Sequence, residues 1–259
     1  MSGSDAAPIG TPPAYVLVHG GRHGGWVWRS VAARLRLTGH EVFVPTLTGL
    51  GERSHLLRPD IGLATHVGDI VKLFEFEDLD DTMLVAHSYG GVPVCGAMEH
   101  IADRVRSIVF VDAHMPRRGE SVFDLIGAER EQRMLTMAKE RGEGWYVPIS
   151  DARWWGLTDQ AQIDWVNSKI TPQPIRTYQD RLESTARAWT HPATFIECNP
   201  SRLQPDELQR IRARADEDPD FRLRHMDTSH EPMVTDPDGL TELLLEAARP
   251  GRRSRVTSQ

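Results

Sequence analysis

The sequence predicts an α/β fold in which a mostly parallel sheet of about six strands carries helices on both faces. Short apolar runs recur between segments with helical spacing. The runs before residue 113 are almost continuously apolar instead of alternating, as is typical of strands covered on both faces. Strands that alternate with helices in this way indicate a parallel sheet.

Each expected element can be placed along the chain. The expected strands are 15–19, 42–45, 83–86, 108–112, 194–198 and 221–226. Helical spacing between the first four strands is shown by Val27, Val31 and Leu35, by Ile70, Leu73 and Phe74, and by Val92, Cys95, Ala97 and Met98. We expect these segments to be crossover helices with right-handed connections.

The alternation stops after Pro116 and resumes near residue 191. Helical stretches without strands are expected at 123–140, 159–169 and 175–187. We therefore expect a core of 14–116 and 191–248 with a helical cap, 117–190, inserted into it. The termini, 1–13 and 250–259, are expected to be flexible because they are small, polar or basic in composition.

Composition excludes several classes of protein. The 259 residues are 39% hydrophobic, which rules out a collagen-like, coiled-coil or wholly disordered chain. A net charge of -7 provides no field that would attract nucleic acid or an anionic membrane. The expected partner is a small molecule, an ester or an aromatic compound, and the oligomeric state is left open.

Two further absences bear on location. Cys95 and Cys198 are the only cysteines, too few for a disulfide framework or a four-thiolate zinc site. No apolar run approaches the roughly 18 residues that a membrane span requires. We expect an unanchored cytoplasmic protein.

The strongest catalytic motif surrounds Ser88, which lies directly after an apolar strand and before a helical segment. This is the context of a nucleophile elbow, a strained turn that needs small residues two positions before and two after the serine. Ala86 and Gly90 meet that need, although alanine replaces the usual first glycine. The alternative is that Ser88 only caps a helix.

A glycine-rich loop, 19–26, follows the first strand. Such a loop can offer a backbone N–H, here that of Gly21, to a developing oxyanion, with the N–H of Tyr89 as the second donor. Phosphate or dinucleotide binding is the competing interpretation. The glycine spacing fits neither nucleotide motif, and Trp26 stands where a Walker loop has lysine.

A serine nucleophile needs a base, and His230 is the best placed of the 11 histidines. It follows the last expected strand, so it should face the same crevice as Ser88 at the carboxyl edge of the sheet. His225 lies within that strand and is expected to be structural. His19 and His23 lie on a glycine loop and not on one helix face, so we expect no metal site and no cofactor.

These motifs together resemble the α/β-hydrolase superfamily, and within it the compact branch of plant methylesterases, hydroxynitrile lyases and bacterial esterases, including esterases of aromatic polyketide methyl esters. The matching pieces extend from about residue 14 to 248 and are His19-Gly20-Gly21, His23-Gly24-Gly25-Trp26, His87-Ser88-Tyr89-Gly90-Gly91, Asp112-Ala113, Met115-Pro116 and Ser229-His230. The resemblance implies the α/β-hydrolase fold with a cap.

The triad acid departs from that branch, which carries an aspartate about three residues past the next-to-last strand. Ser201 occupies this place here, and a serine cannot supply the charge that stabilises an imidazolium. Asp112, at the end of the strand that follows the elbow strand, is the preferred replacement because some α/β-hydrolases place the acid there. Asp206, at an expected helix start, and Asp227, in its own loop, are alternatives.

The expected function is that of a serine hydrolase acting through an acyl-enzyme on a carboxylic ester, such as a methyl or an aromatic polyketide-type ester. Ser88 would be the nucleophile, His230 the base and Asp112 the orienting acid. The alternative is a lyase or cyclase that uses His230 as a lone acid and base. A ligand-binding pseudoenzyme is a third interpretation.

Two sequence features bear on the substrate. Hydroxynitrile lyases carry a threonine and a lysine where this chain has Gly20 and Glu231, so that activity is disfavoured. Trp26 and Trp155 are the candidate substrate-binding aromatics. Trp154 and Trp155 cannot both face inward on one helix, and the tryptophans of the insertion can instead form the core of the cap.

Overall fold

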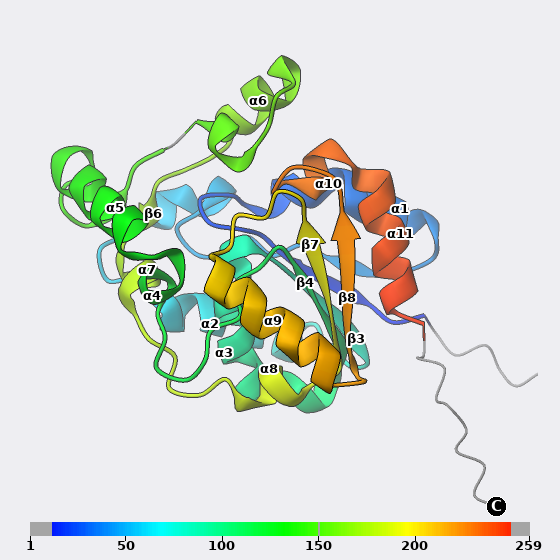
Figure 1. The fold of residues 1–259 in the computed structure, drawn as a ribbon. Coiled ribbons are helices and arrows are strands. Elements are labelled where there is room, and N and C mark those ends of the chain that lie inside the picture. Colours follow the sequence, from blue (N-terminus) through cyan, green and yellow to red (C-terminus); the bar gives the residue numbers. More distant parts are fainter. Residues whose placement is uncertain (1–11, 150, 250–259) are drawn as a thin grey trace, which may run out of the picture.

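The computed structural model describes residues 12–149 and 151–249, so the expected flexible termini lie outside the described residues except for 12 and 13. Six parallel strands form the main sheet in the order β2-β1-β3-β4-β7-β8. They are β1 (Tyr15–Val18), β2 (Val42–Phe43), β3 (Thr82–His87), β4 (Val105–Val111), β7 (Ala193–Cys198) and β8 (Phe221–Met226). The predicted α/β fold is confirmed (Figure 1).

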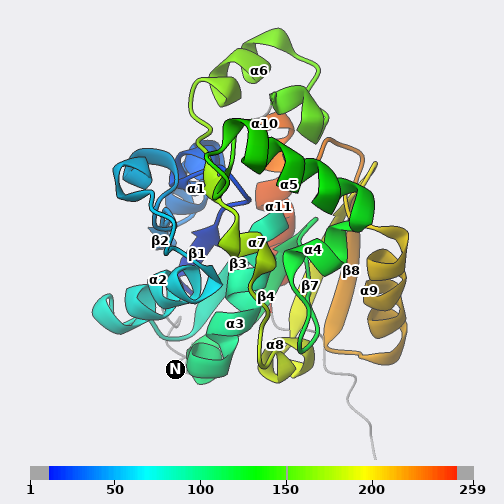
Figure 2. The same ribbon diagram turned by 90° about the vertical axis from the view of Figure 1, so that its left-hand side faces the viewer.

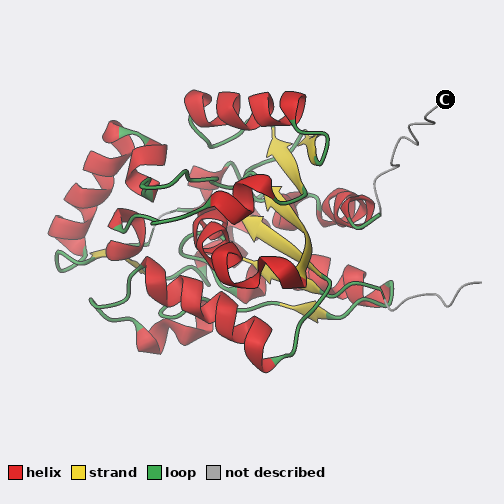
Figure 3. Ribbon diagram, turned by 90° about the horizontal axis from the view of Figure 1, so that it is seen from below, coloured by secondary structure: helices red, strands yellow, loops and turns green. Residues whose placement is uncertain are grey.

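Helices cover both faces of this sheet, as Figure 3 shows. One face packs against α1 (Arg29–Leu37) and α11 (Pro237–Ala247). The helices on the other face are α2 (Leu63–Phe76), α3 (Gly91–Ile101), α8 (Ala186–Thr190) and α9 (Pro205–Glu217).

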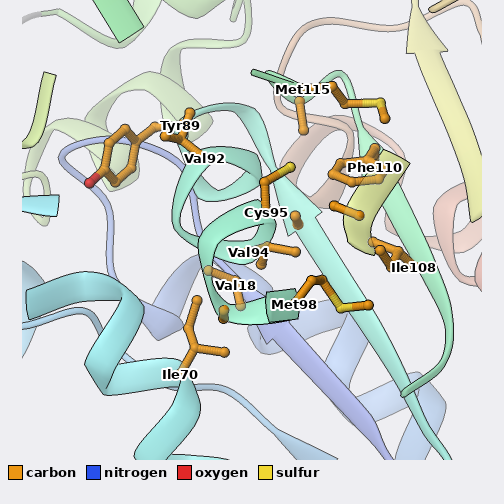
Figure 4. Close-up of a cluster of buried hydrophobic side chains, with 14 of the residues drawn as sticks. Val18, Ile70, Tyr89, Val92, Val94, Cys95, Met98, Ile108, Phe110 and Met115 are labelled. Atoms are coloured by element: carbon orange, nitrogen blue, oxygen red, sulfur yellow. The ribbon is translucent and has the colours of Figure 1, made fainter. Parts of the chain in front are cut away.

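The core of the second face is centred on α3, which is apolar almost all round because it lies between the sheet and other helices. Cys95 and Met98 of α3 lie beside Phe110 and Ile108 of β4 (Figure 4). All four side chains are fully buried. This packing holds the start of α3, and with it the preceding turn, in a fixed position against the sheet.

The strand register determines which residues meet at the carboxyl edge. His87 at the end of β3 pairs with Val111 at the end of β4. The next residue in each chain segment, Ser88 and Asp112, therefore leaves the sheet at the same level. Both have positive φ, 52° and 40°, a conformation uncommon for residues other than glycine and one that bends the chain sharply away from the strand.

The inserted segment contains α4 (Val122–Ile126), α5 (Ala128–Arg141), α6 (Gln160–Asn167) and α7 (Arg176–Gln179). Figure 2 shows α5 passing over the sheet, with α6 farther out. The predicted helix 123–140 is divided at Gly127, whose φ is 83°. The helix predicted over 175–187 consists instead of α7 and, after a gap, α8.

The prediction that the insertion contains no strand is wrong. β5 (Tyr146–Val147) and β6 (Gln173–Pro174) pair in an antiparallel two-stranded sheet. Each strand has only two residues, too few for an alternating pattern to be recognised in the sequence. Among the described helices, none combines the length and apolar character needed to cross a membrane.

Candidate active site

Ser88 lies on the turn between β3 and α3, within the short 3-10 helix η3 (Ser88–Gly90). The turn leaves no room for side chains after the serine. A Cβ on Gly90 would lie 2.6 Å from the carbonyl oxygen of His19, and one on Gly91 would lie 2.1 Å from that of His114. Small residues here are therefore a steric requirement of an elbow that presents Ser88 at the sheet edge.

The His230 imidazole contacts both other predicted members of the triad. Its Nε2 lies 2.9 Å from Oγ of Ser88, and its Nδ1 lies 2.5 Å from Oδ2 of Asp112. The backbone of His230 is fixed at both polar groups. Its N–H donates to the carbonyl of Trp155, and its carbonyl accepts a hydrogen bond from Nε2 of His87. An Nδ1–H donated to the carboxylate leaves Nε2 free to accept the serine proton.

The Asp112 carboxylate is fully buried and accepts three hydrogen bonds. Besides His230, its donors are Oγ of Ser201 at 2.5 Å and the backbone N–H of Arg202 at 3.1 Å. A buried charge is tolerated when it is paired and hydrogen-bonded in this way. The loop after β7, where Ser201 lies, thus holds the carboxylate that directly follows β4.

The two alternative acids lie elsewhere. Asp206 is exposed in the first turn of α9. Asp227 is also exposed, and its carboxylate accepts a hydrogen bond from Nδ2 of Asn199 at 3.1 Å. Of the three aspartates, only Asp112 contacts His230.

Gly21 and Tyr89, the predicted oxyanion donors, line the same cavity as Ser88. The Tyr89 phenol points away into the protein, where it contacts Nδ1 of His66 at 2.7 Å, and burial raises the pKa of Tyr89 well above its usual range. Its backbone N–H stays beside the serine at the start of η3. A Cβ on Gly21 would lie 2.8 Å from Oη of Tyr178, so this position admits only glycine without a shift.

Gln173, from β6, holds the glycine-rich loop 19–26 and was not singled out from the sequence. Its side-chain oxygen accepts hydrogen bonds from the N–H of Arg22 at 2.7 Å and from Oη of Tyr178 at 2.9 Å. The contact joins residues that are 151 positions apart in the chain. No local sequence pattern signals such a contact.

The cavity above Ser88 is lined by residues of the insertion as well as by the core. Both Trp154 and Trp155 line it, because they lie on the short 3-10 helix η5 (Ala152–Trp155) and not on one α-helix. Trp26 is not among the lining residues. Its ring packs edge to face on Trp165 at 5.1 Å, in an apolar cluster that also contains Trp155, so Trp26 lies behind the cavity wall and does not form part of it.

A buried polar pair lies behind His230. Nε2 of His23 approaches Oε1 of Glu231 to 3.4 Å, and both side chains are almost completely buried. Burial raises the pKa of Glu231 well above its usual range, an effect that the Asp112 charge increases, and burial lowers the pKa of His23 to about 3. Glu231 is not among the residues that line the cavity.

Within residues 12–149 and 151–249, no three His, Cys, Asp or Glu side chains are grouped to hold a metal ion. Both ring nitrogens of His19 form hydrogen bonds with backbone groups. Its Nδ1 donates to the carbonyl of Gly20 at 2.8 Å, and its Nε2 accepts from the N–H of Leu47 at 3.0 Å.

A serine on an elbow, a histidine after the last strand and a carboxylate, together at the carboxyl edge of a parallel sheet, define the α/β-hydrolase class of proteins. The sequence model of the alpha/beta hydrolase family matches residues 15–243. The chain belongs to this family, which confirms the resemblance found in the motifs.

Two relatives and one solved structure are similar to this chain. The chain is 39% identical over 173 residues to a carbendazim hydrolyzing esterase of Nocardioides, covering 64% of this chain and 71% of the relative. It is 26% identical to methylesterase 10 of Arabidopsis thaliana, covering 90% and 91% of the two chains. An extracellular alpha/beta-hydrolase from a Paenibacillus species has the same fold, with a TM-score of 0.81 at 22% identity, covering 92% and 100%.

Proposed function

We propose that this protein is a serine-dependent carboxylic ester hydrolase. The observation that carries the proposal is the chain of contacts from Ser88 Oγ to His230 Nε2 at 2.9 Å and from His230 Nδ1 to Asp112 at 2.5 Å. Two relatives that carry esterase names support the same reaction class.

In the first half of the reaction, Oγ of Ser88 attacks the ester carbonyl carbon while Nε2 of His230 takes the serine proton. Asp112 stabilises the imidazolium that forms. The carbonyl oxygen becomes an oxyanion and accepts hydrogen bonds from the N–H groups of Gly21 and Tyr89. The tetrahedral intermediate then expels the alcohol oxygen, which takes the proton from His230 and leaves an acyl group on Ser88.

In the second half, a water molecule attacks the acyl carbon and gives a proton to Nε2 of His230. Collapse of this second intermediate breaks the bond to Oγ of Ser88, which recovers its proton from His230. The products are the carboxylic acid and the alcohol, and the enzyme is regenerated. No step of this sequence requires a further reagent.

The lyase or cyclase alternative depends on His230 working without an acid partner. The contact between Asp112 and Nδ1 of His230 disfavours that alternative. An intact nucleophile, base and pair of oxyanion donors likewise disfavours a pseudoenzyme.

We further propose that the natural substrate contains an apolar or aromatic group, because Trp154, Trp155 and Tyr178 line the cavity. Methyl esters and aromatic polyketide-type esters both meet that description. A cytoplasmic setting is part of the same proposal and is supported by Cys95 and Cys198, which are buried free thiols.

A fluorophosphonate probe followed by peptide mapping tests the proposal. The probe should label Ser88 in the unmodified protein, fail to label the Ser88→Ala variant, and react far more slowly with His230→Ala. His225→Ala, an exposed histidine on β8, is the matched control and should be labelled normally. An esterase activity that survives Ser88→Ala at full turnover would overturn the proposal.

A further inference from the structure

The cavity above Ser88 is strongly basic although the chain is acidic. Its lining includes Arg22, Arg130, Arg133 and Arg202, and among the described lining residues there is no aspartate or glutamate. The chain as a whole has a net charge of -7. The overall composition of the chain therefore does not explain why arginines are concentrated at the site of the proposed reaction.

Two of these arginines lie over Trp154, and a third contacts one of them. The guanidinium carbons of Arg133 and Arg202 lie 4.5 and 5.0 Å from the centre of its ring. Nη1 of Arg130 donates to the carbonyl of Arg202 at 2.8 Å. Arg130 and Arg133 come from α5, whereas Arg202 comes from the loop after β7, so two separate elements bring the three charges together.

Two buried carboxylates close to the cavity already have partners. Asp112 lies behind His230 and accepts three hydrogen bonds, of which Arg202 contributes only its backbone N–H. Glu207 contacts His114, which also lines the cavity, at 2.9 Å.

Within the described part of the chain, Arg130, Arg133 and Arg202 form no ion pair with a carboxylate. Arg153, beside Trp154 on η5, does pair with Asp151 at 2.8 Å. Burial and the neighbouring Arg130 lower the pKa of Arg202, while the Asp112 charge raises it, so Arg130 and Arg202 repel each other. An anion bound there would relieve this repulsion through charge-assisted hydrogen bonds, for which guanidinium groups are well suited.

We infer that the cavity selects esters that carry an additional anionic group, a carboxylate or a comparable oxyanion, which binds to Arg130 and Arg202 while the ester lies at Ser88. The apolar part of such a substrate contacts the wall that includes Trp154, Val122, Ile126 and Leu203. This inference rests on the proposed ester hydrolysis and specifies its substrate class.

A matched pair of p-nitrophenyl esters tests the selectivity. One is the monoester of a dicarboxylic acid, and the other is the same molecule with the free carboxylate replaced by a primary amide. The unmodified enzyme should have the higher kcat/KM for the anionic ester. Arg130→Gln and Arg202→Gln should each lower kcat/KM for the anionic ester by roughly 10-fold or more, the range expected for one lost charge-assisted hydrogen bond.

The neutral ester distinguishes a binding role from a structural one. The ratio of kcat/KM for the anionic ester to that for the neutral ester should fall in both variants, because the neutral ester lacks the charge that these arginines recognise. Arg153→Gln, which removes an arginine already paired with Asp151, should retain the preference of the unmodified enzyme. Equal losses for the two esters, or no preference in the unmodified enzyme, would overturn the inference.

A binding measurement separates failure of this inference from failure of the proposed function. In the Ser88→Ala protein, phenylbutyrate should raise the melting temperature more than phenylbutyramide does, and Arg202→Gln should abolish the difference. If no ester is cleaved, the proposed hydrolysis fails and this comparison alone decides the inference. Equal shifts for the acid and the amide would contradict anion selection.

Discussion

The carboxylate of Asp112 lies 2.5 Å from Nδ1 of His230 although their strands, β4 and β8, are not neighbours in the sheet. β7 lies between them. The carboxylate therefore reaches across the end of β7, and the loop that follows β7 donates two hydrogen bonds to it. The loop after β7 thus positions a carboxylate that follows the neighbouring strand, β4.

Ser201→Ala tests whether that loop positions the acid. The change removes one of three hydrogen bonds to a buried carboxylate, and bonds to charged groups contribute about 1.5–3 kcal/mol. We expect a lower free energy of unfolding by about that amount in urea titrations, together with a lower kcat/KM. Ser201→Thr, which keeps the hydroxyl, should recover most of both. A Ser201→Ala protein as stable and active as the original would contradict this role.

The buried histidines make stability depend on pH, and His19 is the clearest case. Burial lowers the pKa of His19 to about 4, and its Nε2 already accepts the N–H of Leu47, so the folded protein disfavours the charged ring. The unfolded chain binds that proton more readily. His19 should therefore reduce the free energy of unfolding by about 1.4 kcal/mol per pH unit as the pH falls from 6.5 toward 4.

Urea denaturation across this pH range measures the effect. His19→Gln should give a shallower loss of stability on acidification than the original protein, whatever its absolute stability. His55→Gln, which changes an exposed histidine, should keep the original slope. Identical slopes for all three proteins would show that His19 is not held neutral.

Glu231→Gln tests a loss of stability in the opposite direction, as the pH rises. Neither carboxylate oxygen of Glu231 forms a hydrogen bond within the described residues, and burial raises its pKa. The unfolded chain therefore loses this proton more easily, and the original protein loses stability as the pH rises above the ordinary glutamate range. We expect the glutamine variant to gain stability relative to the original between pH 6 and pH 9 in thermal melts. A relative loss over that interval would mean that the charged carboxylate stabilises the fold.

Local sequence patterns predicted the sheet, the elbow and the position of His230, because each depends on residues close together in the chain. For the acid, the residues favoured Asp112 over Asp206 and Asp227, but only the strand order brings Asp112 to His230. The sequence could not show that the Trp26 ring packs against Trp165, a distant residue of the insertion, instead of lining the cavity.

The polar contacts behind the site were missed for the same reason. Gln173 holds the loop of Arg22, and Glu231 meets His23, across more than a hundred positions of the chain in each case. Contacts of this kind depend on how the insertion packs over the sheet. The two short strands β5 and β6, which place Gln173, were themselves too short to predict.

The catalytic rate of Asp112→Asn is the most direct test of the triad formed by Ser88, His230 and Asp112. Asparagine keeps the size of the side chain but cannot stabilise the imidazolium or hold the tautomer that accepts the serine proton. We predict that kcat/KM for a p-nitrophenyl ester falls by about 10³- to 10⁴-fold, while Asp227→Asn, an exposed control, leaves it unchanged. An Asp112→Asn enzyme within about tenfold of the original rate would contradict the account.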